Sequence, residues 1–233
     1  MKSLVIACFF ALFSLQAMAA SGGVHLDQVE IDITDQASLQ RGAKTFVNYC
    51  LSCHEASFMR YNRMAKDLGL TDDQVKENLM FASDKIGDTM TVAMRPEDAE
   101  KWFGVTPPDL SVIARARGTD WLYTYLRTFY LDESRPMGTN NVAFKDVGMP
   151  HVLWEQQGYL AKNDNGELVQ ATEGQMSQHQ YNVMIHDLVN FLAYISEPSK
   201  LERMALAKWV LLYLFIFFLV AYPLKKAFWK DVH

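Results

Sequence analysis

Apolar positions gather into continuous runs near both ends of the chain. The run from Leu4 to Leu15 follows the basic Lys2. Toward the other end, Trp209 to Leu224 contains no charged residue. As a helix rising about 1.5 Å per residue, Leu206 to Leu224 would cover roughly 28 Å, close to the thickness of a bilayer's hydrocarbon core. Because this run is apolar on every side, it predicts one transmembrane helix rather than a buried helix of a globular core.

Between these runs, apolar residues recur at helical spacing in two places. Asp35 can cap a helix in which Leu39, Gly42, Phe46 and Cys50 follow one another at steps of three and four. A second helix is predicted from Asn182 to Ile195. Its stripe comprises Ile185, Leu188, Val189, Leu192 and Ile195. The chain is therefore predicted to be mainly α-helical.

The two ends also predict where the chain resides. The first apolar run is shorter than the about 20 residues of a spanning helix and precedes the small residues Ala17 to Ala20, as in a secretory signal peptide. Lys225, Lys226 and Lys230 follow the second run, which places the C-terminus in the cytoplasm. We expect a signal peptide over residues 1–19, one exported domain over 20–204, and a single membrane anchor with a short tail over 205–233.

Charge restricts the partners of the exported domain. The whole chain carries a formal net charge of -5, and most of the lysines near the C-terminus lie in or beyond the anchor. The exported part is therefore more acidic than the whole, which argues against nucleic-acid binding and favours basic partners. The acidic residues cluster at Asp72-Asp73, Glu97-Asp98-Glu100 and Asp132-Glu133.

The candidate chemistry lies in the run Cys50-Leu51-Ser52-Cys53-His54. Cysteines at this spacing can hold a haem through two thioethers while the histidine that follows binds the iron. A redox dithiol or half of a zinc site would also use two close cysteines, but zinc needs about two more ligands. The remaining cysteine, Cys8, lies in the predicted signal peptide. The motif predicts one covalently attached haem c, with His54 as an iron ligand.

The residues alone leave the sixth iron ligand open. Met137 and Met149 both lie in stretches with glycine and proline, where a loop can bring a thioether over the haem. His151, His179 and His186 could compete with them. The other methionines of the exported domain are expected to fill the core.

The order of motifs resembles the cytochrome c1 family. The resemblance rests on the signal peptide, the haem motif, the C-terminal anchor and five short segments between them. These segments are Pro107-Pro108-Asp109-Leu110-Ser111, Arg115-Ala116-Arg117, Gly148-Met149-Pro150, Met176-Ser177-Gln178 and Ser196-Glu197-Pro198. The resemblance implies a haem domain like class I cytochromes c with extended loops, in which Gly42 lets the C-terminal helix cross closely and Phe46 packs in the crossing.

The same resemblance assigns site residues. It implies that Met149 is the sixth ligand, that Pro108 and Leu110 line the haem crevice, and that Arg117 rather than Arg115 pairs with a haem propionate. With His54 and Met149 both on the iron, no position remains for a substrate, so no catalytic residue is expected.

The function implied is electron transfer in the haem subunit of a quinol:cytochrome c oxidoreductase, the cytochrome bc1 complex. The implied partners are cytochrome b, the Rieske iron-sulfur protein as donor, a cytochrome c as acceptor, and membrane lipid. The implied location is the bacterial inner membrane, with the haem domain in the periplasm. The alternatives are a membrane-anchored monohaem cytochrome that serves an oxidase or dehydrogenase, and a peroxidase-like haem enzyme with an open distal site.

Overall fold

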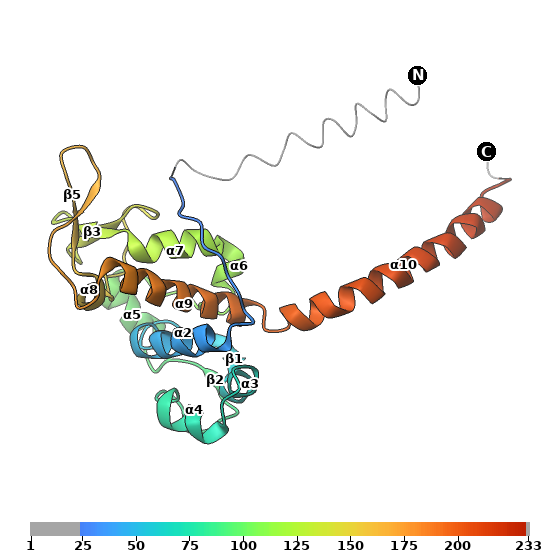
Figure 1. The fold of residues 1–233 in the computed structure, drawn as a ribbon, viewed down its shortest axis with the longest axis horizontal. Helices are drawn as coiled ribbons and strands as arrows, with labels where there is room; N and C mark the ends of the chain where they lie inside the picture. Colours follow the sequence, from blue (N-terminus) through green and yellow to red (C-terminus); the bar gives the residue numbers. More distant parts are fainter. Residues whose placement is uncertain (1–23, 232–233) are drawn as a thin grey trace. The chain divides into compact units, whose positions relative to one another are not determined.

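The computed structural model describes residues 24–231, and helices make up most of its regular structure (Figure 1). The helices are α2 (Gln36–Tyr49), α3 (Tyr61–Asp67), α4 (Asp72–Asn78), α5 (Pro96–Phe103), α6 (Ile113–Arg117), α7 (Thr119–Arg127), α8 (Trp154–Gln157), α9 (Gln178–Ser196) and α10 (Lys200–Phe228). The predicted mainly α-helical fold is confirmed. The predicted signal peptide lies outside the described residues.

Contacts within the chain define two compact units. The first contains residues 24–30, 95–107 and 117–186, and the second contains residues 31–94, 108–116 and 187–231. Helix α9 contributes its first part to the first unit and its second part to the second. The single exported domain expected over residues 20–204 stays a prediction.

The core of the second unit contains the predicted crossing of α2 and α9. Asp35 caps α2, where its carboxylate accepts a hydrogen bond from the Ser38 amide at 3.0 Å. Gly42 lies so close to α9 that a Cβ atom there would be 2.1 Å from the Asp187 carbonyl oxygen. The Phe46 and Phe191 rings lie 5.6 Å apart at a tilt of 46°. Both features expected of this glycine and this aromatic residue are present.

A buried carboxylate adds a polar contact to the same crossing. The Asp187 side chain is 4% exposed and accepts hydrogen bonds from Arg41 Nε at 2.6 Å and Arg41 Nη2 at 2.9 Å. It also accepts one from Ser38 Oγ at 2.7 Å, while Asn190 donates to that same hydroxyl at 3.0 Å. Because a buried charge without partners is costly, this network favours one register of the two helices.

The strands form three two-stranded antiparallel ladders. They are β1 (Ala56–Arg60) with β2 (Thr89–Met90), β3 (Phe129–Leu131) with β4 (Thr139–Asn141), and β5 (Leu160–Lys162) with β6 (Leu168–Gln170). A turn at Asn163–Gly166 joins β5 to β6, and Gly166 has a φ of +80° there. Met90 lies in β2 and is fully buried.

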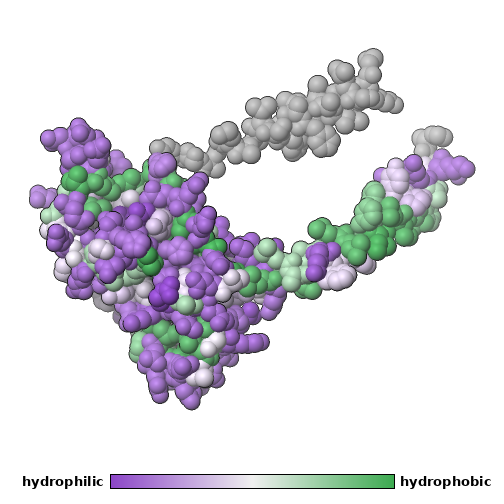
Figure 2. Space-filling model, in the orientation of Figure 1, coloured by the Kyte–Doolittle hydropathy of each residue, from purple (hydrophilic) through white to green (hydrophobic). Residues whose placement is uncertain are grey.

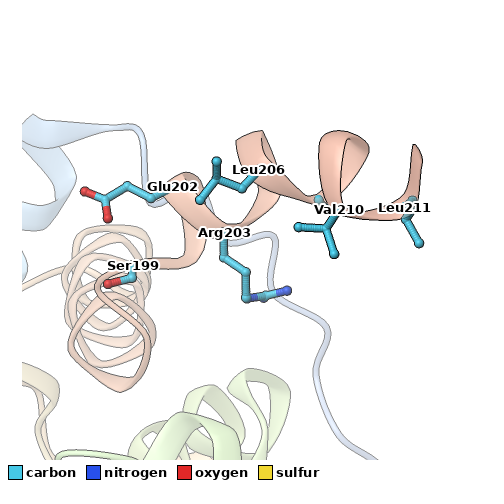
Figure 3. Close-up of a pocket in the computed structure, with 7 residues that line it drawn as sticks. Ser199, Glu202, Arg203, Leu206, Val210 and Leu211 are labelled. Atoms are coloured by element: carbon cyan, nitrogen blue, oxygen red, sulfur yellow. The ribbon is translucent and has the colours of Figure 1, made fainter. Parts of the chain in front are cut away.

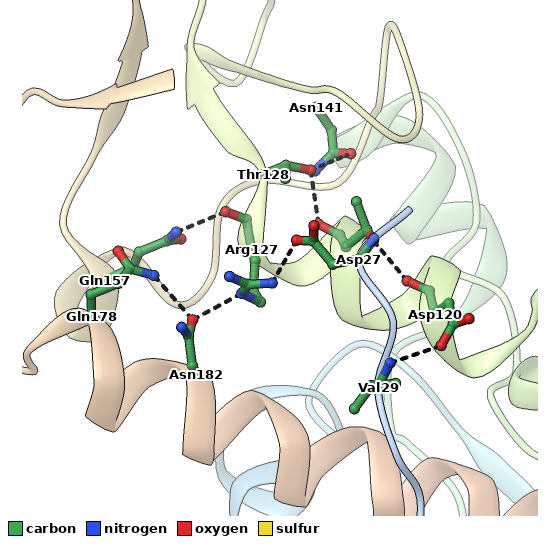
Figure 4. Close-up of polar contacts among 10 residues, drawn as sticks. Asp27, Val29, Asp120, Arg127, Thr128, Asn141, Gln157, Gln178 and Asn182 are labelled. Carbon is green, nitrogen blue, oxygen red and sulfur yellow. Dashed lines mark hydrogen bonds and ion pairs between the residues drawn. The ribbon is translucent and has the colours of Figure 1, made fainter. Parts of the chain in front are cut away.

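A polar network in the first unit holds the N-terminal segment against α7 (Figure 4). Arg127 Nη1 lies 2.6 Å from the Asp27 carboxylate, and Arg127 Nε donates to Asn182 on α9 at 2.8 Å. The Asp27 amide donates to Thr124 Oγ1 at 2.8 Å, and the Val29 amide donates to the Asp120 carboxylate at 3.0 Å. These contacts hold the start of the described chain along α7.

Helix α10 is 29 residues long and has no buried residue. Apolar side chains cover most of its surface (Figure 2). Within residues 24–231 it is the one helix long and apolar enough to cross a membrane. A hollow along its first turns is lined by seven residues of the same region, six of which are labelled in Figure 3. The hollow contains none of the predicted haem residues, and the predicted C-terminal anchor matches this helix.

Candidate haem site

The haem motif forms one helical turn at the end of α2. Cys50 is the C-cap residue of α2, and its carbonyl oxygen accepts hydrogen bonds from the Cys53 amide at 3.0 Å and the His54 amide at 2.8 Å. The turn places both thiols and the imidazole on adjacent positions of a short, closed segment. This is the local geometry that attachment of one haem at two cysteines requires.

The surroundings of the thiols argue against the other uses of two cysteines. Cys50 is buried, and burial raises the pKa of its thiol to about 12. Redox dithiols depend on a lowered thiol pKa, because the thiolate is the reactive species. In the described part of the chain, no group of three or more His, Cys, Asp or Glu side chains is arranged to hold a metal ion. Among these residues, a zinc site at Cys50 and Cys53 would therefore lack its remaining ligands.

A backbone carbonyl orients the His54 ring. His54 Nδ1 lies 2.8 Å from the Pro108 carbonyl oxygen. Since a carbonyl oxygen only accepts, Nδ1 must carry the proton and donate it, which leaves Nε2 with its lone pair. Burial lowers the pKa of His54, although the bond to Pro108 opposes this shift, so the ring is neutral at pH 7. A neutral imidazole with an oriented Nε2 is a ready iron ligand.

The segment that supplies this carbonyl is an anchored loop. Pro107 and Pro108 do not open a helix, because α6 begins only at Ile113. The Asp109 carboxylate instead accepts hydrogen bonds from the Ser111 amide at 2.6 Å, the Ser57 amide at 3.1 Å and the Ser57 hydroxyl. A side chain that bonds the amide two residues ahead competes with helix formation.

Two further bonds tie the loop to the chain that follows the haem motif. The Leu110 amide donates to the Glu55 carbonyl at 2.7 Å, and the Phe58 amide donates to Ser111 Oγ at 3.0 Å. Burial alone would raise the pKa of Asp109, but hydrogen bonds from Ser111 and Ser57 outweigh it and lower the pKa. The carboxylate is therefore ionised at pH 7 and holds Pro108 in place for His54.

In the first unit, Met149 is held by Tyr125 of α7. The Tyr125 hydroxyl donates a hydrogen bond to the Met149 sulfur at 3.3 Å. The Tyr125 ring stacks on Trp121 at 4.9 Å and meets the edge of Phe129 at 5.1 Å. Nothing in the sequence distinguishes the Tyr125 hydroxyl from those of the other tyrosines nearby.

The competing ligands differ in their surroundings. Met59, Met64 and Met90 are almost fully buried in the core of the second unit, as expected of filling residues. Met137 is half-buried in the turn between β3 and β4, beside Gly138 with a φ of +69°. His151 is buried and stacks on Phe129 at 5.0 Å. The prediction that Met149 rather than Met137 binds iron stays a prediction.

The two histidines of α9 have other settings. His186 bonds the Glu30 carbonyl through Nε2 at 2.8 Å, and His179 is exposed. Neither setting resembles that of His54, whose ring lies beside the two cysteines on one turn.

The two arginines of α6 have different partners. Arg115 Nη1 lies 3.1 Å from the Glu197 carboxylate and forms an ion pair with it. The Arg117 guanidinium lies 5.1 Å from the centre of the Trp121 ring and 5.7 Å from that of Phe144. Across residues 24–231, Arg117 has no carboxylate within ion-pair distance.

Comparison with known proteins places these features in a family. The model of the Cytochrome C1 family matches residues 28–232. A cytochrome c1 from Allochromatium vinosum is 48% identical over all of both chains, and one from Rhodospirillum rubrum is 27% identical over 99% of this chain and 97% of its own. A Nitrosomonas europaea protein named ammonia monooxygenase gamma subunit is 49% identical over all of this chain and 98% of its own.

Among solved structures, a chain of a hyperthermophilic respiratory complex III covers all of both chains with a TM-score of 0.43 and 16% identity. The assignment rests on the family model and on the full-length relatives. It agrees with the helical fold and the anchor helix described above. The chain belongs to the cytochrome c1 family.

Proposed function

We propose that this chain is the electron-transfer haem subunit of a quinol:cytochrome c oxidoreductase. The observation that carries the proposal is the hydrogen bond from His54 Nδ1 to the Pro108 carbonyl oxygen. His54 directly follows Cys53 on the turn that also contains Cys50. The hydrogen bond prepares Nε2 as an iron ligand in a chain that belongs to the cytochrome c1 family. The haem itself supplies a one-electron couple.

Each residue has a defined task in this proposal. Cys50 and Cys53 form the two thioethers, and His54 and Met149 bind the iron. The loop with Pro108 and Leu110 lines the crevice, and its anchoring by Asp109 keeps the His54 ring in one orientation. With both axial positions taken, the chain has no place for a substrate on the iron, and its role is to accept and pass single electrons.

Arg117 is the arginine that we assign to a haem propionate. Its guanidinium has no carboxylate partner among the described residues, whereas Arg115 is paired with Glu197. A planar guanidinium can bind a carboxylate with two hydrogen bonds, and this is the pairing that a propionate needs.

The proposed partners follow from the family. The Rieske iron-sulfur protein would be the donor, cytochrome b the subunit that oxidises quinol, and a cytochrome c the acceptor. Helix α10 would anchor the chain in the bacterial inner membrane, with Lys225 and Lys226 on the cytoplasmic side and the haem in the periplasm.

The name of the Nitrosomonas relative favours one alternative, an electron-transfer subunit that works with a monooxygenase. Purification from native membranes through a C-terminal tag separates the two. We expect a b-type cytochrome and an iron-sulfur protein to copurify with the chain. Copurification with an oxygenase, or recovery of the chain with neither partner, would contradict the proposal.

Ligation is tested separately. Met149→Leu should remove the near-infrared sulfur-to-iron charge-transfer band of the oxidised protein, and Met137→Leu should leave it. The two substitutions are chemically identical, so a loss of the band only in Met137→Leu would show that the sixth ligand is wrongly assigned.

A further inference from the structure

We propose that Tyr125 tunes the reduction potential of the haem iron through its hydrogen bond to the Met149 sulfur. This inference rests on the proposed function, in which Met149 binds the iron. Tyr125 Oη lies 3.3 Å from Met149 Sδ, and both residues belong to the first unit of the chain. A thioether sulfur has two lone pairs, so one can accept from Tyr125 while the other binds the iron.

The hydroxyl is fixed in the role of donor. A phenol has an ordinary pKa of about 10, so the Tyr125 hydroxyl carries its proton at pH 7. Within the described chain, the Met149 sulfur is the hydrogen-bond partner of this hydroxyl. A protonated phenol beside a thioether can only donate, because sulfur carries no proton.

Two aromatic rings hold the ring that carries the hydroxyl, and a hydrogen bond from Asn141 holds its backbone. Trp121 stacks against it at an interplanar angle of 12°, and Phe129 meets it edge-on at 71°. Asn141 Nδ2 donates to the Tyr125 backbone carbonyl at 2.7 Å. Because packing holds the ring, the hydroxyl oxygen stays beside the Met149 sulfur. Replacing Tyr125 by phenylalanine should therefore remove the oxygen without moving the ring.

This hydrogen bond should favour the reduced iron. The hydrogen bond withdraws electron density from the Met149 sulfur, which then donates less to the iron. Ferric iron is stabilised by this donation more than ferrous iron is. Removing the hydroxyl should therefore stabilise the oxidised form and lower the potential. A hydrogen bond of ordinary strength corresponds to a change of up to about tenfold in the electron-transfer equilibrium, or about 59 mV for a one-electron couple.

The matched control is Tyr123→Phe on the same helix. The Tyr123 ring lies under the Arg127 guanidinium at 4.4 Å, and no hydrogen bond joins Tyr123 to Met149. Tyr125→Phe and Tyr123→Phe each remove one phenolic oxygen from α7 and keep the ring. A difference between them therefore reports the contact with the sulfur rather than a general effect on the helix.

The experiment is a spectroelectrochemical titration of the purified, detergent-solubilised holoprotein, with the near-infrared band recorded in the same samples. Tyr125→Phe should lower the midpoint potential and shift the band, and Tyr123→Phe should change neither. Equal potentials in Tyr125→Phe and wild type would overturn the inference and leave the ligation standing, provided Met149→Leu abolishes the band. A band that survives Met149→Leu would overturn both.

Discussion

A single methyl group at Gly42 tests the packing on which the haem turn depends. In Gly42→Ala the new Cβ would lie 2.1 Å from the Asp187 carbonyl oxygen and 2.7 Å from Phe191 Cβ. Neither neighbour can rotate away, since one is backbone and the other is a Cβ atom. Helices α2 and α9 would have to separate, which would also loosen the contact of Phe46 with Phe191.

The sign of the effect is decided by two opposing terms. Replacing glycine by alanine inside an ordinary helix stabilises it by about 0.5–1 kcal/mol. Forcing a group into a closely packed contact costs about 1–3 kcal/mol, and the rigid neighbours here favour the upper end. We expect the free energy of unfolding to fall by about 2 kcal/mol, which lowers Tm by about 4–8 °C in a chain of this size.

The control is Gly87→Ala, because a Cβ at Gly87 would meet no atom within 4 Å. It should change the free energy of unfolding by less than about 0.5 kcal/mol, because the added methyl group creates no clash. Thermal unfolding of the detergent-solubilised holoprotein, followed by circular dichroism and by haem absorbance, measures both variants. A Gly42→Ala protein as stable as wild type would refute the close crossing.

Three further predictions follow from individual side chains. Reduction of a basic cytochrome c should slow as salt rises, and the double substitution Glu97→Gln with Glu100→Gln should flatten this dependence. Asp98→Asn should change the salt dependence less, because Asp98 is paired with Arg95 at 2.6 Å and Lys101 at 3.8 Å. Equal changes in the stopped-flow rates of the two variants would contradict this prediction. Since the folded pKa of Asp109 is lowered, its contribution to stability is present above the ordinary aspartate pKa and is lost as pH falls through the folded value. In Asp109→Asn the free energy of unfolding should therefore fall less steeply as pH is lowered below the ordinary aspartate pKa. An unchanged pH dependence would contradict the role of Asp109 in this loop. Cys53→Ser should reduce haem retained on denaturing gels, and full retention would contradict attachment at this thiol.

The sequence predicts the parts of the fold in which apolar residues recur at regular spacing or in which a motif is contiguous. Helices α2 and α9 show apolar stripes, the anchor is continuously apolar, and the haem motif is a contiguous run. The three ladders were not predicted, because strands of two to five residues are too short to show an alternating pattern.

The sequence also could not show how side chains complete the site. Pro108 and His54 are far apart in the chain, so the bond that orients the imidazole depends on the tertiary fold. Tyr125 and Met149 are likewise joined only in the folded chain. The resemblance favoured Arg117 over Arg115 as the propionate partner, but the ion pair between Arg115 and Glu197 is visible only in the folded chain.

The family assignment from the ordered motifs is confirmed by the family model and the full-length relatives. Motifs that are modest one by one become specific as a set because their order along the chain is also constrained. The iron ligands, the propionate partner and the signal peptide stay predictions, since each depends on a haem or on residues outside those described.

The central claim is that the haem on this chain carries electrons from quinol to a cytochrome c. Its most direct test mixes quinol with the oxidised, purified complex in a stopped-flow spectrometer and follows the c-type haem. This haem should be reduced within one turnover and reoxidised when ferricytochrome c is added. A haem that stays oxidised while ferricytochrome c is reduced at the full rate would contradict it.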